Sequence, residues 1–350
     1  MSAEATGPNK AVHVISRPEG MVSVDNFAVV EVDEPTAPTA EAPVQLKLEH
    51  VSVDPYMRGR MRDAKSYIPP FALGEPGAGG VVARVVAVAD DGETAGLAAG
   101  DLVVGMLPWV LRQNARPDGL TKVDEAVLGG ASSSLLLGVL GLTGLTALLP
   151  IEKFSQPEAG KVAFVSGAAG AVGSVAGAVL KAKGCTVYGS AGSDEKCAIA
   201  QADCGFDAVF NYKTVGSPGE GLDSVLDGKA IDIYYDNVGG EMLDAVLARM
   251  APNGVIICCG AISQYNKKPE ELYGLKNYFN IIGRSLSVHG FIVTNWANEF
   301  PAAIGRLAGM LQAGQIPVKE TVREGFESVP AAFVDLFKGA NVGKMIVSKL

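Results

Sequence analysis

The sequence predicts an α/β protein in which a β-rich segment precedes a doubly wound parallel sheet of the Rossmann type. Residues 11–135 contain short β-branched runs, separated by proline and glycine clusters such as the one at 68–70. From Lys161 onward, apolar strands alternate with helical segments, which is typical of a parallel sheet covered by helices. A chain of 350 residues is also long enough to form two domains.

Hydrophobic periodicity predicts the individual elements. In the β-rich part, strands are expected at 44–53, 80–88 and 102–106, and in the alternating part at 161–166, 185–190, 208–212, 231–236, 254–259 and 285–292. Helices are expected at 171–183, 194–204 and 240–250. The segment from Ile316 onward is expected to return to short strands and turns that fold back onto the first domain.

Composition narrows the class of protein. The net charge of -9 and the absence of a basic stripe argue against a nucleic-acid surface. Residues 135–151 are the most apolar stretch, but they are shorter than the roughly 20 residues of a membrane span, so a buried helix is predicted. The first ten residues contain no apolar run, so no signal peptide is expected.

The cysteine pattern is typical of a reducing compartment. Five cysteines are present, none of them in a CxxC pair, so disulfides are not expected and a cytoplasmic location is predicted. Cys258 and Cys259 stand next to each other in an apolar run and are expected to be buried as small hydrophobic residues.

A glycine-rich turn follows the strand predicted at 161–166. It reads Gly-Ala-Ala-Gly-Ala-Val-Gly over 167–173 and leads directly into a predicted helix. Gly170 allows the backbone to approach a pyrophosphate closely, and Gly173 allows the helix to pack tightly on the strand. The N-terminus of that helix then presents N–H groups to phosphates. This order of strand, turn and helix predicts a dinucleotide site, although Ala168 occupies the first glycine position of the usual pattern.

The end of the second strand indicates which dinucleotide binds. NAD-binding units usually carry an acidic residue there, which holds the ribose 2′-hydroxyl. Residues 187–193 contain no carboxylate, and Asp194 and Glu195 fall in the first turn of the next helix. Lys196, Tyr212 and Lys213 follow nearby. Small residues and lysines suit a 2′-phosphate, so the sequence favours NADPH.

Seven stretches of the chain together resemble one family. They are VDPYMRGRM (53–61), GAAGAVGSVAG (167–177), AGSDEK (191–196), FNYKT (210–214), DNVGGEMLD (236–244), CGAISQYN (259–266) and NVGK (341–344). They resemble the zinc-independent medium-chain dehydrogenase/reductases, within the group of prostaglandin reductases (leukotriene 12-hydroxydehydrogenases) and plant double-bond reductases. One departure lies at 142–149, where the family tends to have a proline at Thr143 and aromatic residues at Leu148 and Leu149.

The resemblance implies a domain plan and a reaction. It implies a β-rich, GroES-like catalytic domain over 1–138 and 314–350, and a Rossmann NADPH-binding domain over 139–313. The implied activity is NADPH-dependent reduction of the carbon–carbon double bond of α,β-unsaturated aldehydes or ketones. The implied assembly is a homodimer, with a small enal or enone as substrate and no membrane or nucleic-acid partner.

The resemblance also implies the site. Tyr265 would lie beside the substrate carbonyl with Tyr56 in the same cleft, and both are the candidate catalytic residues. Lys196 and Tyr212 would contact the adenosine 2′-phosphate. Together with the glycine turn, the implied cofactor-binding residues are Thr146, Ala169, Gly170, Ala171, Val172, Gly173, Gly192, Ser193, Lys196, Tyr212, Asn237, Cys259, Gly260, Ala261, Ile262, Ser263, Tyr265, Phe291, Ile292, Val293 and Asn341.

The implied reaction explains why tyrosines are of interest. Hydride addition to the β-carbon leaves negative charge on the carbonyl oxygen, which requires a hydrogen-bond donor aimed at that oxygen and later a proton for the α-carbon. A phenol can donate without carrying charge itself. The donor could be Tyr265, Tyr56 or the ribose 2′-hydroxyl of the cofactor, and in either of the last two cases Tyr265 would be a packing residue.

A catalytic zinc site is not expected. Zinc-dependent relatives carry a Gly-His-Glu run near 73–80, where this chain has no histidine. The three histidines, His13, His50 and His289, are widely scattered, and no cysteine precedes Cys185. Two alternative functions stay open: a zinc-free NADPH quinone reductase of the same superfamily, and a non-catalytic NADPH-binding protein.

Overall fold

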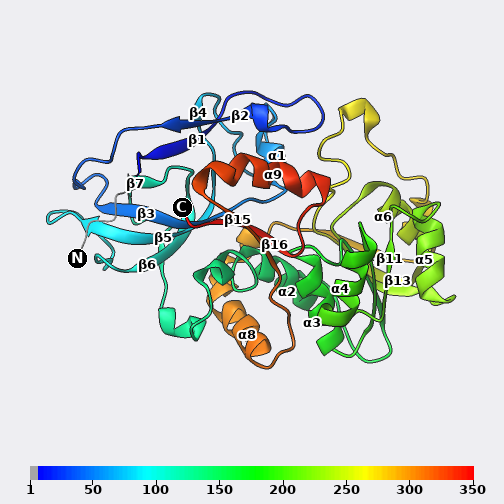
Figure 1. The fold of residues 1–350 in the computed structure, drawn as a ribbon. Helices are drawn as coiled ribbons and strands as arrows, with labels where there is room; N and C mark the ends of the chain where they lie inside the picture. The colour runs from blue at the N-terminus through cyan, green and yellow to red at the C-terminus, as the bar shows by residue number, and fades with distance from the viewer. Residues whose placement is uncertain (1–6) are drawn as a thin grey trace. The chain divides into compact units, whose positions relative to one another are not determined.

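The computed structural model describes residues 7–350, which form two compact units (Figure 1). The main segment of the first unit ends at Leu137, and this unit also includes Val322–Ala340 and Met345–Leu350. The second unit comprises Gly138–Thr321 and Asn341–Lys344. All of 314–350 was expected in the first domain, whereas residues 314–321 and 341–344 belong to the second unit. Backbone hydrogen bonds explain the difference, because Lys344 N–H donates to the Lys319 carbonyl oxygen at 2.8 Å.

The second unit is built on a six-stranded parallel sheet in the order β11-β10-β9-β12-β13-β14. Its strands are β9 (Val162–Ser166), β10 (Thr186–Ala191), β11 (Ala208–Asn211), β12 (Ile231–Asp236), β13 (Met250–Cys258) and β14 (Ser287–Gly290). The chain runs outward to one edge, returns to the centre, and then runs to the other edge. This order is that of the doubly wound Rossmann fold, so the predicted fold class is confirmed.

Helices cover the sheet because its strands are apolar on both faces. They are α2 (Leu142–Phe154), α3 (Gly173–Ala182), α4 (Asp194–Cys204), α5 (Pro218–Leu226), α6 (Gly240–Leu247), α7 (Phe279–Gly283) and α8 (Phe300–Gln312). Alternate side chains of the central strands, such as Phe164 and Tyr234, pack with Leu222 of α5 and Met242 of α6 in one cluster. Helix α3 packs against α2, β9 and β10.

The first unit is rich in antiparallel strands. One small sheet has the order β2-β1-β4, and a larger one has the order β15-β16-β3-β5-β6-β8, with β7 paired to β3. The strands are β1 (Lys10–Val14), β2 (Phe27–Glu31), β3 (Val44–Ser52), β4 (Glu75–Pro76), β5 (Ala78–Val88), β6 (Leu102–Pro108), β7 (Arg112–Ala115), β8 (Thr121–Lys122), β15 (Glu320–Glu324) and β16 (Lys344–Ser348). Their buried faces share a core with the helix α9 (Val329–Lys338), in which Phe27 meets Phe333 edge to face at 5.7 Å.

Two predictions about local structure were wrong. The stretch 135–151 is not one helix: a short 3₁₀ turn (Ser133–Leu137) is followed by α2, which starts only at Leu142. The break forms because the Gly138 carbonyl accepts from the Gly141 and Gly144 N–H groups and from the Thr143 hydroxyl at 2.8–3.2 Å. The segment from Ile316 onward contains the ten-residue helix α9 between its strands, where only strands and turns were expected.

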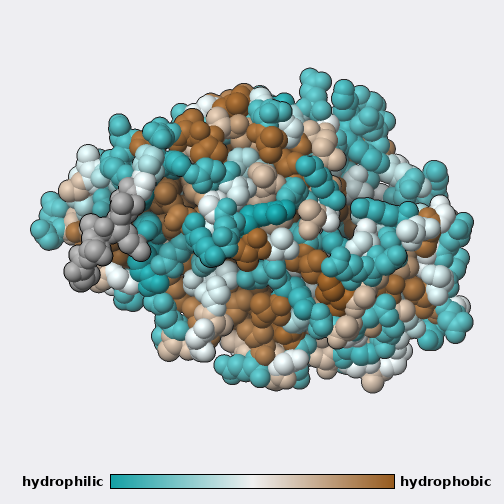
Figure 2. Space-filling model, in the orientation of Figure 1, coloured by the Kyte–Doolittle hydropathy of each residue, from teal (hydrophilic) through white to brown (hydrophobic). Residues whose placement is uncertain are grey.

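The surface shown in Figure 2 carries hydrophilic side chains over much of its area, with apolar groups in separate patches between them. Within residues 7–350, no helix combines the length and the apolar character that a membrane crossing requires.

Candidate active site

The glycine turn at the end of β9 has the tight geometry that its sequence predicts. Gly167 has a left-handed φ of +68°, and Gly170 N–H donates to the Gly167 carbonyl at 2.9 Å. Helix α3 begins at Gly173, where an added Cβ would lie only 2.2 Å from the Gly167 carbonyl oxygen. Val172 at the N-cap offers no side-chain acceptor to the first turn of α3. Backbone N–H groups at this helix start can therefore serve an anionic group, which fits a pyrophosphate.

A distant part of the chain lies against this turn. Gly343 N–H donates to the Ala169 carbonyl at 2.8 Å, and Gly343 forms a parallel bridge with Gly170. The Asn341 amide donates to the Gly343 carbonyl at 2.7 Å. Only glycine fits at Gly343, because its φ is +65° and a Cβ would lie 1.9 Å from the Lys319 carbonyl oxygen. The structure thus brings Asn341 beside the glycine turn.

The end of β10 carries the candidate 2′-phosphate residues. Ser193 caps α4, and its hydroxyl accepts a hydrogen bond from Lys196 N–H at 3.2 Å. A Cβ on Gly192 would lie 2.9 Å from the Tyr212 hydroxyl oxygen, so the tyrosine ring end lies directly against this glycine. Burial lowers the pKa of the Lys196 ammonium, and the nearby Lys213 charge lowers it further. Gly192, Ser193, Lys196 and Tyr212 therefore lie together, next to a second lysine.

A hydrogen-bonded cluster around Asp236, at the ends of β9 and β12, was not predicted. Asp236 is 1% exposed, and its carboxylate accepts hydrogen bonds from Val238 N–H at 2.9 Å, Gly239 N–H at 2.8 Å and the Tyr234 hydroxyl at 2.6 Å. Burial raises the pKa of Asp236, and these hydrogen bonds oppose that shift. The Ser166 hydroxyl accepts from Asn237 N–H at 3.0 Å. In the sequence, Asp236 ends an apolar strand and begins the DNVGGEMLD stretch, but neither feature indicates these hydrogen bonds.

The loop after β13 packs against the cluster around Asp236. Cys259 and Gly260 both donate backbone N–H groups to the Asp236 carbonyl, at 2.9 and 3.0 Å. Ile262 N–H donates to the Asn237 carbonyl at 3.3 Å, and the Ser263 hydroxyl donates to the Val238 carbonyl at 2.7 Å. The structure therefore brings Asn237 together with the predicted residues of the 259–263 loop.

Tyr265 lies within the same loop and is half-buried. Its hydroxyl oxygen accepts a hydrogen bond from Ala261 N–H at 3.2 Å, and a Cβ on Gly260 would lie 3.1 Å from it. A hydroxyl that accepts a hydrogen bond becomes a somewhat better donor, because chains of hydrogen bonds polarise one another. The loop therefore fixes this phenol at the carboxyl end of the parallel sheet, where open α/β sheets bind ligands.

Thr146 and Phe291 approach the loop from neighbouring elements. The Tyr235 hydroxyl donates to the Thr146 carbonyl on α2 and contacts the Cys259 thiol. Strand β14 pairs with β13 so that Gly290 lies beside Cys258, which places Phe291 just beyond the end of the sheet. The Phe291 ring stacks on Trp296 with centroids 5.6 Å apart. Ile292 is half-buried and Val293 is buried next to them.

The two adjacent cysteines are less buried than expected. Cys258 and Cys259 are free thiols of intermediate exposure. Burial nevertheless raises the pKa of each thiol to about 12. The sulfur atoms are therefore more buried than the exposure of the two whole residues indicates.

Tyr56 belongs to the first unit. It directly precedes the short helix α1 (Met57–Arg60) and packs against the core of that unit. Burial and the nearby Asp54 carboxylate raise the pKa of Tyr56 above its usual value, while the Arg60 charge lowers it. The phenol is therefore neutral near pH 7 and able to donate a hydrogen bond. Its position in a shared cleft with Tyr265 stays a prediction.

The His, Cys, Asp and Glu side chains of the described residues do not form a site for a metal ion. Across residues 7–350, no three His, Cys, Asp or Glu side chains cluster closely enough to hold one. His50 is engaged by two serine hydroxyls, that of Ser348 at 2.7 Å and that of Ser133 at 3.0 Å. The His289 ring stacks on Phe154 with centroids 4.4 Å apart.

Removal of metal ions is expected to leave activity intact. The reason is the absence of a suitable ligand cluster in the described part of the chain. The check is exhaustive chelation followed by a rate measurement and elemental analysis. Stoichiometric zinc that is lost together with activity would contradict this expectation.

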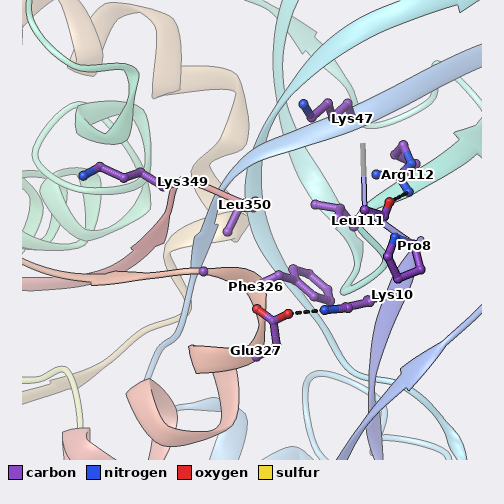
Figure 3. Close-up of a pocket in the computed structure, with 11 residues that line it drawn as sticks. Pro8, Lys10, Lys47, Leu111, Arg112, Phe326, Glu327, Lys349 and Leu350 are labelled. Carbon is purple, nitrogen blue, oxygen red and sulfur yellow. Dashed lines mark hydrogen bonds and ion pairs between the residues drawn. The ribbon is translucent and has the colours of Figure 1, made fainter. Parts of the chain in front are cut away.

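The first unit also contains a cavity of about 520 Å³, which does not coincide with the candidate site. Figure 3 shows part of its lining, with the Lys10 ammonium paired to the Glu327 carboxylate. Arg112, also at this cavity, pairs with Glu34. None of the described residues that line it is a predicted cofactor-binding or catalytic residue. The geometry of the loops in the second unit, rather than the size of this cavity, therefore identifies the candidate site.

Comparison with known proteins gives matches over most of the chain. Residues 10–123 match a family described as the N-terminal domain of oxidoreductase, and residues 171–309 match one described as zinc-binding dehydrogenase. The NADP-dependent oxidoreductase YfmJ of Bacillus subtilis is 40% identical over 98% of this chain and 98% of its own length. A 2-alkenal reductase (NADP⁺-dependent) of Nicotiana tabacum is 39% identical over 89% of this chain and 88% of its own.

A solved structure agrees with these matches. The crystal structure of CurA from Vibrio vulnificus in complex with NADPH superposes with a TM-score of 0.87 at 33% identity. The match covers 97% of this chain and 99% of that chain.

Proposed function

Because the chain belongs to the zinc-independent medium-chain dehydrogenase/reductases and is an NADPH-dependent oxidoreductase, we propose that it reduces the carbon–carbon double bond of α,β-unsaturated aldehydes or ketones. The observation that carries the proposal is the Tyr265 phenol, fixed by Ala261 N–H at the carboxyl end of the parallel sheet. The name of the tobacco relative, a 2-alkenal reductase, supports this class of substrate.

We propose that the second unit holds NADPH. The cradle is the turn 167–173, in which the position of Gly173 admits no Cβ, and the pyrophosphate would lie over the N–H groups at the start of α3. Lys196 and Tyr212 would bind the 2′-phosphate. Asn237, Asn341 and the 259–263 loop would line the rest of the dinucleotide, with Phe291, Ile292, Val293 and Thr146 along the remaining sides.

The chemistry then divides between cofactor and protein. NADPH supplies the hydride that reduces the β-carbon of the substrate. The Tyr265 hydroxyl donates a hydrogen bond to the substrate carbonyl oxygen, where negative charge develops. Tyr56, which is neutral near pH 7, is the second candidate for this donation. A proton then reaches the α-carbon, which completes the saturated carbonyl product.

The test is a panel of enals, enones and quinones, each offered with NADPH or NADH and followed at the nicotinamide absorbance. The proposal requires NADPH-dependent loss of the double bond, with the saturated aldehyde or ketone identified as product. If only the quinones are turned over, the protein is a quinone reductase and the proposed double-bond reduction is wrong. Tight NADPH binding without turnover of any of these compounds would favour a non-catalytic protein.

Replacing Lys196 with Ala is expected to weaken NADPH binding at least about tenfold, because a charge-assisted hydrogen bond contributes roughly 1.5–3 kcal/mol. NADH carries no 2′-phosphate, so its affinity should change little. Fluorescence titration of each cofactor measures both values. Lys183→Ala, at an exposed lysine beyond the C-terminal end of α3, is the matched control. Equal weakening of both cofactors would refute the assignment of Lys196.

We propose a homodimer as the assembly and the cytoplasm as the location. Strand β14 is the terminal strand of its sheet, and α7, which precedes β14 in the chain, carries exposed apolar side chains, with Phe279 at 73% and Ile282 at 63%. An exposed strand edge beside apolar residues is suited to pairing with a second copy. The five free cysteines support a reducing compartment.

A further inference from the structure

The side chain of Asn211 links two charged segments at the candidate 2′-phosphate site. Asn211 ends β11 and pairs with Ala191 at the end of β10. Its Nδ2 donates to the Asp194 carboxylate at 2.8 Å, and its Oδ1 accepts from Lys213 N–H at 3.1 Å. One amide therefore fixes an acidic residue on one side and the backbone of a basic residue on the other.

The charged side chains near this amide act on different neighbours. Besides the effect of burial, the pKa of Lys196 responds to Lys213, which lowers it, and to Glu195, which raises it. The negative charge of Asp194 instead acts on Cys197, whose pKa it raises in addition to the effect of burial. The Asp194 carboxylate is thus bound by the Asn211 amide, and Lys213 and Glu195 are the neighbouring charges that act on Lys196.

We propose that Asn211 is a positioning residue that sets the preference for the 2′-phosphorylated cofactor, by holding the Asp194 carboxylate away from the Lys196 and Lys213 ammonium groups. This inference rests on the proposed placement of the 2′-phosphate at Lys196 and Tyr212. NAD-binding Rossmann units hold the ribose 2′-hydroxyl with an acidic residue close to this point. Without Asn211, the Asp194 carboxylate would pair with one of the lysines and repel the 2′-phosphate, which would favour the unphosphorylated cofactor. Asn211 prevents this by binding the carboxylate.

Two small probes isolate this effect from the rest of the cofactor. Adenosine 2′,5′-bisphosphate carries the 2′-phosphate and 5′-AMP lacks it, and titration calorimetry of the full chain gives the dissociation constant of each. In Asn211→Ala, the bisphosphate should bind about fivefold more weakly, the size expected when an exposed charge pair is rearranged. The affinity for 5′-AMP should change less than about twofold, because that probe makes no 2′-phosphate contact.

The double variant Asn211→Ala/Asp194→Asn provides the decisive comparison. Removing the released carboxylate should restore the affinity ratio of the two probes to that of the unmodified protein. The matched control is Asp194→Asn alone, which should not weaken the bisphosphate. If the alanine variant is unstable, Asn211→Ser, whose side chain is too short to span the same distance, should give the same ratio.

Two outcomes overturn the inference. The first is an equal loss of affinity for both probes in Asn211→Ala, which indicates only that Asn211 shapes the end of β11. The second is a double variant in which the affinity ratio of the two probes does not recover. A parallel titration of Lys196→Ala separates this inference from the proposed function. If Lys196→Ala selectively weakens the bisphosphate and Asn211→Ala does not, only the role of Asn211 fails. If Lys196→Ala has no selective effect, the placement of the 2′-phosphate itself fails.

Discussion

Replacing Tyr265 with Phe is expected to lower kcat about 100- to 1000-fold for a simple enone, because the loss of one oxyanion donor costs about 2.7–4 kcal/mol. The substitution keeps the aromatic ring, so packing of the 259–265 loop should survive. The affinity for NADPH should therefore stay close to that of the unmodified enzyme. Steady-state kinetics and a separate NADPH titration measure the two quantities independently.

Part of any fall in kcat would come from the structural role of the same hydroxyl and not from donation to the substrate. It accepts a hydrogen bond from Ala261 N–H at 3.2 Å, and this bond is also lost in the Phe variant. A single neutral hydrogen bond contributes about 0.5–1.5 kcal/mol, which corresponds to at most roughly a tenfold change. A fall in kcat well beyond tenfold would therefore require the donation to substrate.

Tyr56→Phe is the matched comparison, because Tyr56 is the other half-buried candidate phenol. If Tyr265→Phe turns over the enone at nearly the original rate, its hydroxyl is not the donor and the ring is a packing residue. A large loss in Tyr56→Phe would then assign the donation to Tyr56. Retention of activity by both variants would leave the ribose 2′-hydroxyl of the cofactor as the donor.

Replacing Gly173 with Ala is expected to weaken NADPH binding more than about tenfold and to destabilise the fold by about 1–3 kcal/mol. The new Cβ would lie 2.2 Å from the Gly167 carbonyl oxygen and 2.8 Å from its carbon, and both are backbone atoms. The turn can relieve this overlap only by moving away from the start of α3. That movement would displace the N–H groups that the pyrophosphate requires.

Gly305→Ala is the matched control for this effect. Gly305 lies inside α8, and an added Cβ would meet no atom within 4 Å. Alanine there should stabilise the protein by roughly 0.5–1 kcal/mol, as it usually does inside a helix. Thermal unfolding and NADPH titration of both variants provide the comparison. A Gly173→Ala variant that binds NADPH normally would exclude this turn as the pyrophosphate cradle.

Elements with strong local signals could be predicted from the sequence. Strand β12 and helix α4 have the predicted bounds, 231–236 and 194–204. The apolar run of β12 ends in Asp236, and α4 is preceded by the N-cap Ser193 and carries acidic residues in its first turn. Helices α5, α8 and α9 were not predicted. Two glycines weaken the helical pattern of α5, and α9 forms where Val329, Phe333 and Leu336 pack on the core of the first unit.

The sequence alone determined the doubly wound fold, the glycine turn and the basic residues after β10, because each depends on residues close together in the chain. The family resemblance already implied that Asn237, the 259–263 loop and Asn341 belong to the site, but only the tertiary structure decided how these distant segments are held together. The pairing of Gly343 with Ala169, the loop over Asp236 and the bridge from Asn211 to Asp194 all depend on hydrogen bonds between separate segments. Such bonds leave no periodic pattern in the sequence, because strand register and loop packing are fixed only when the whole sheet has formed.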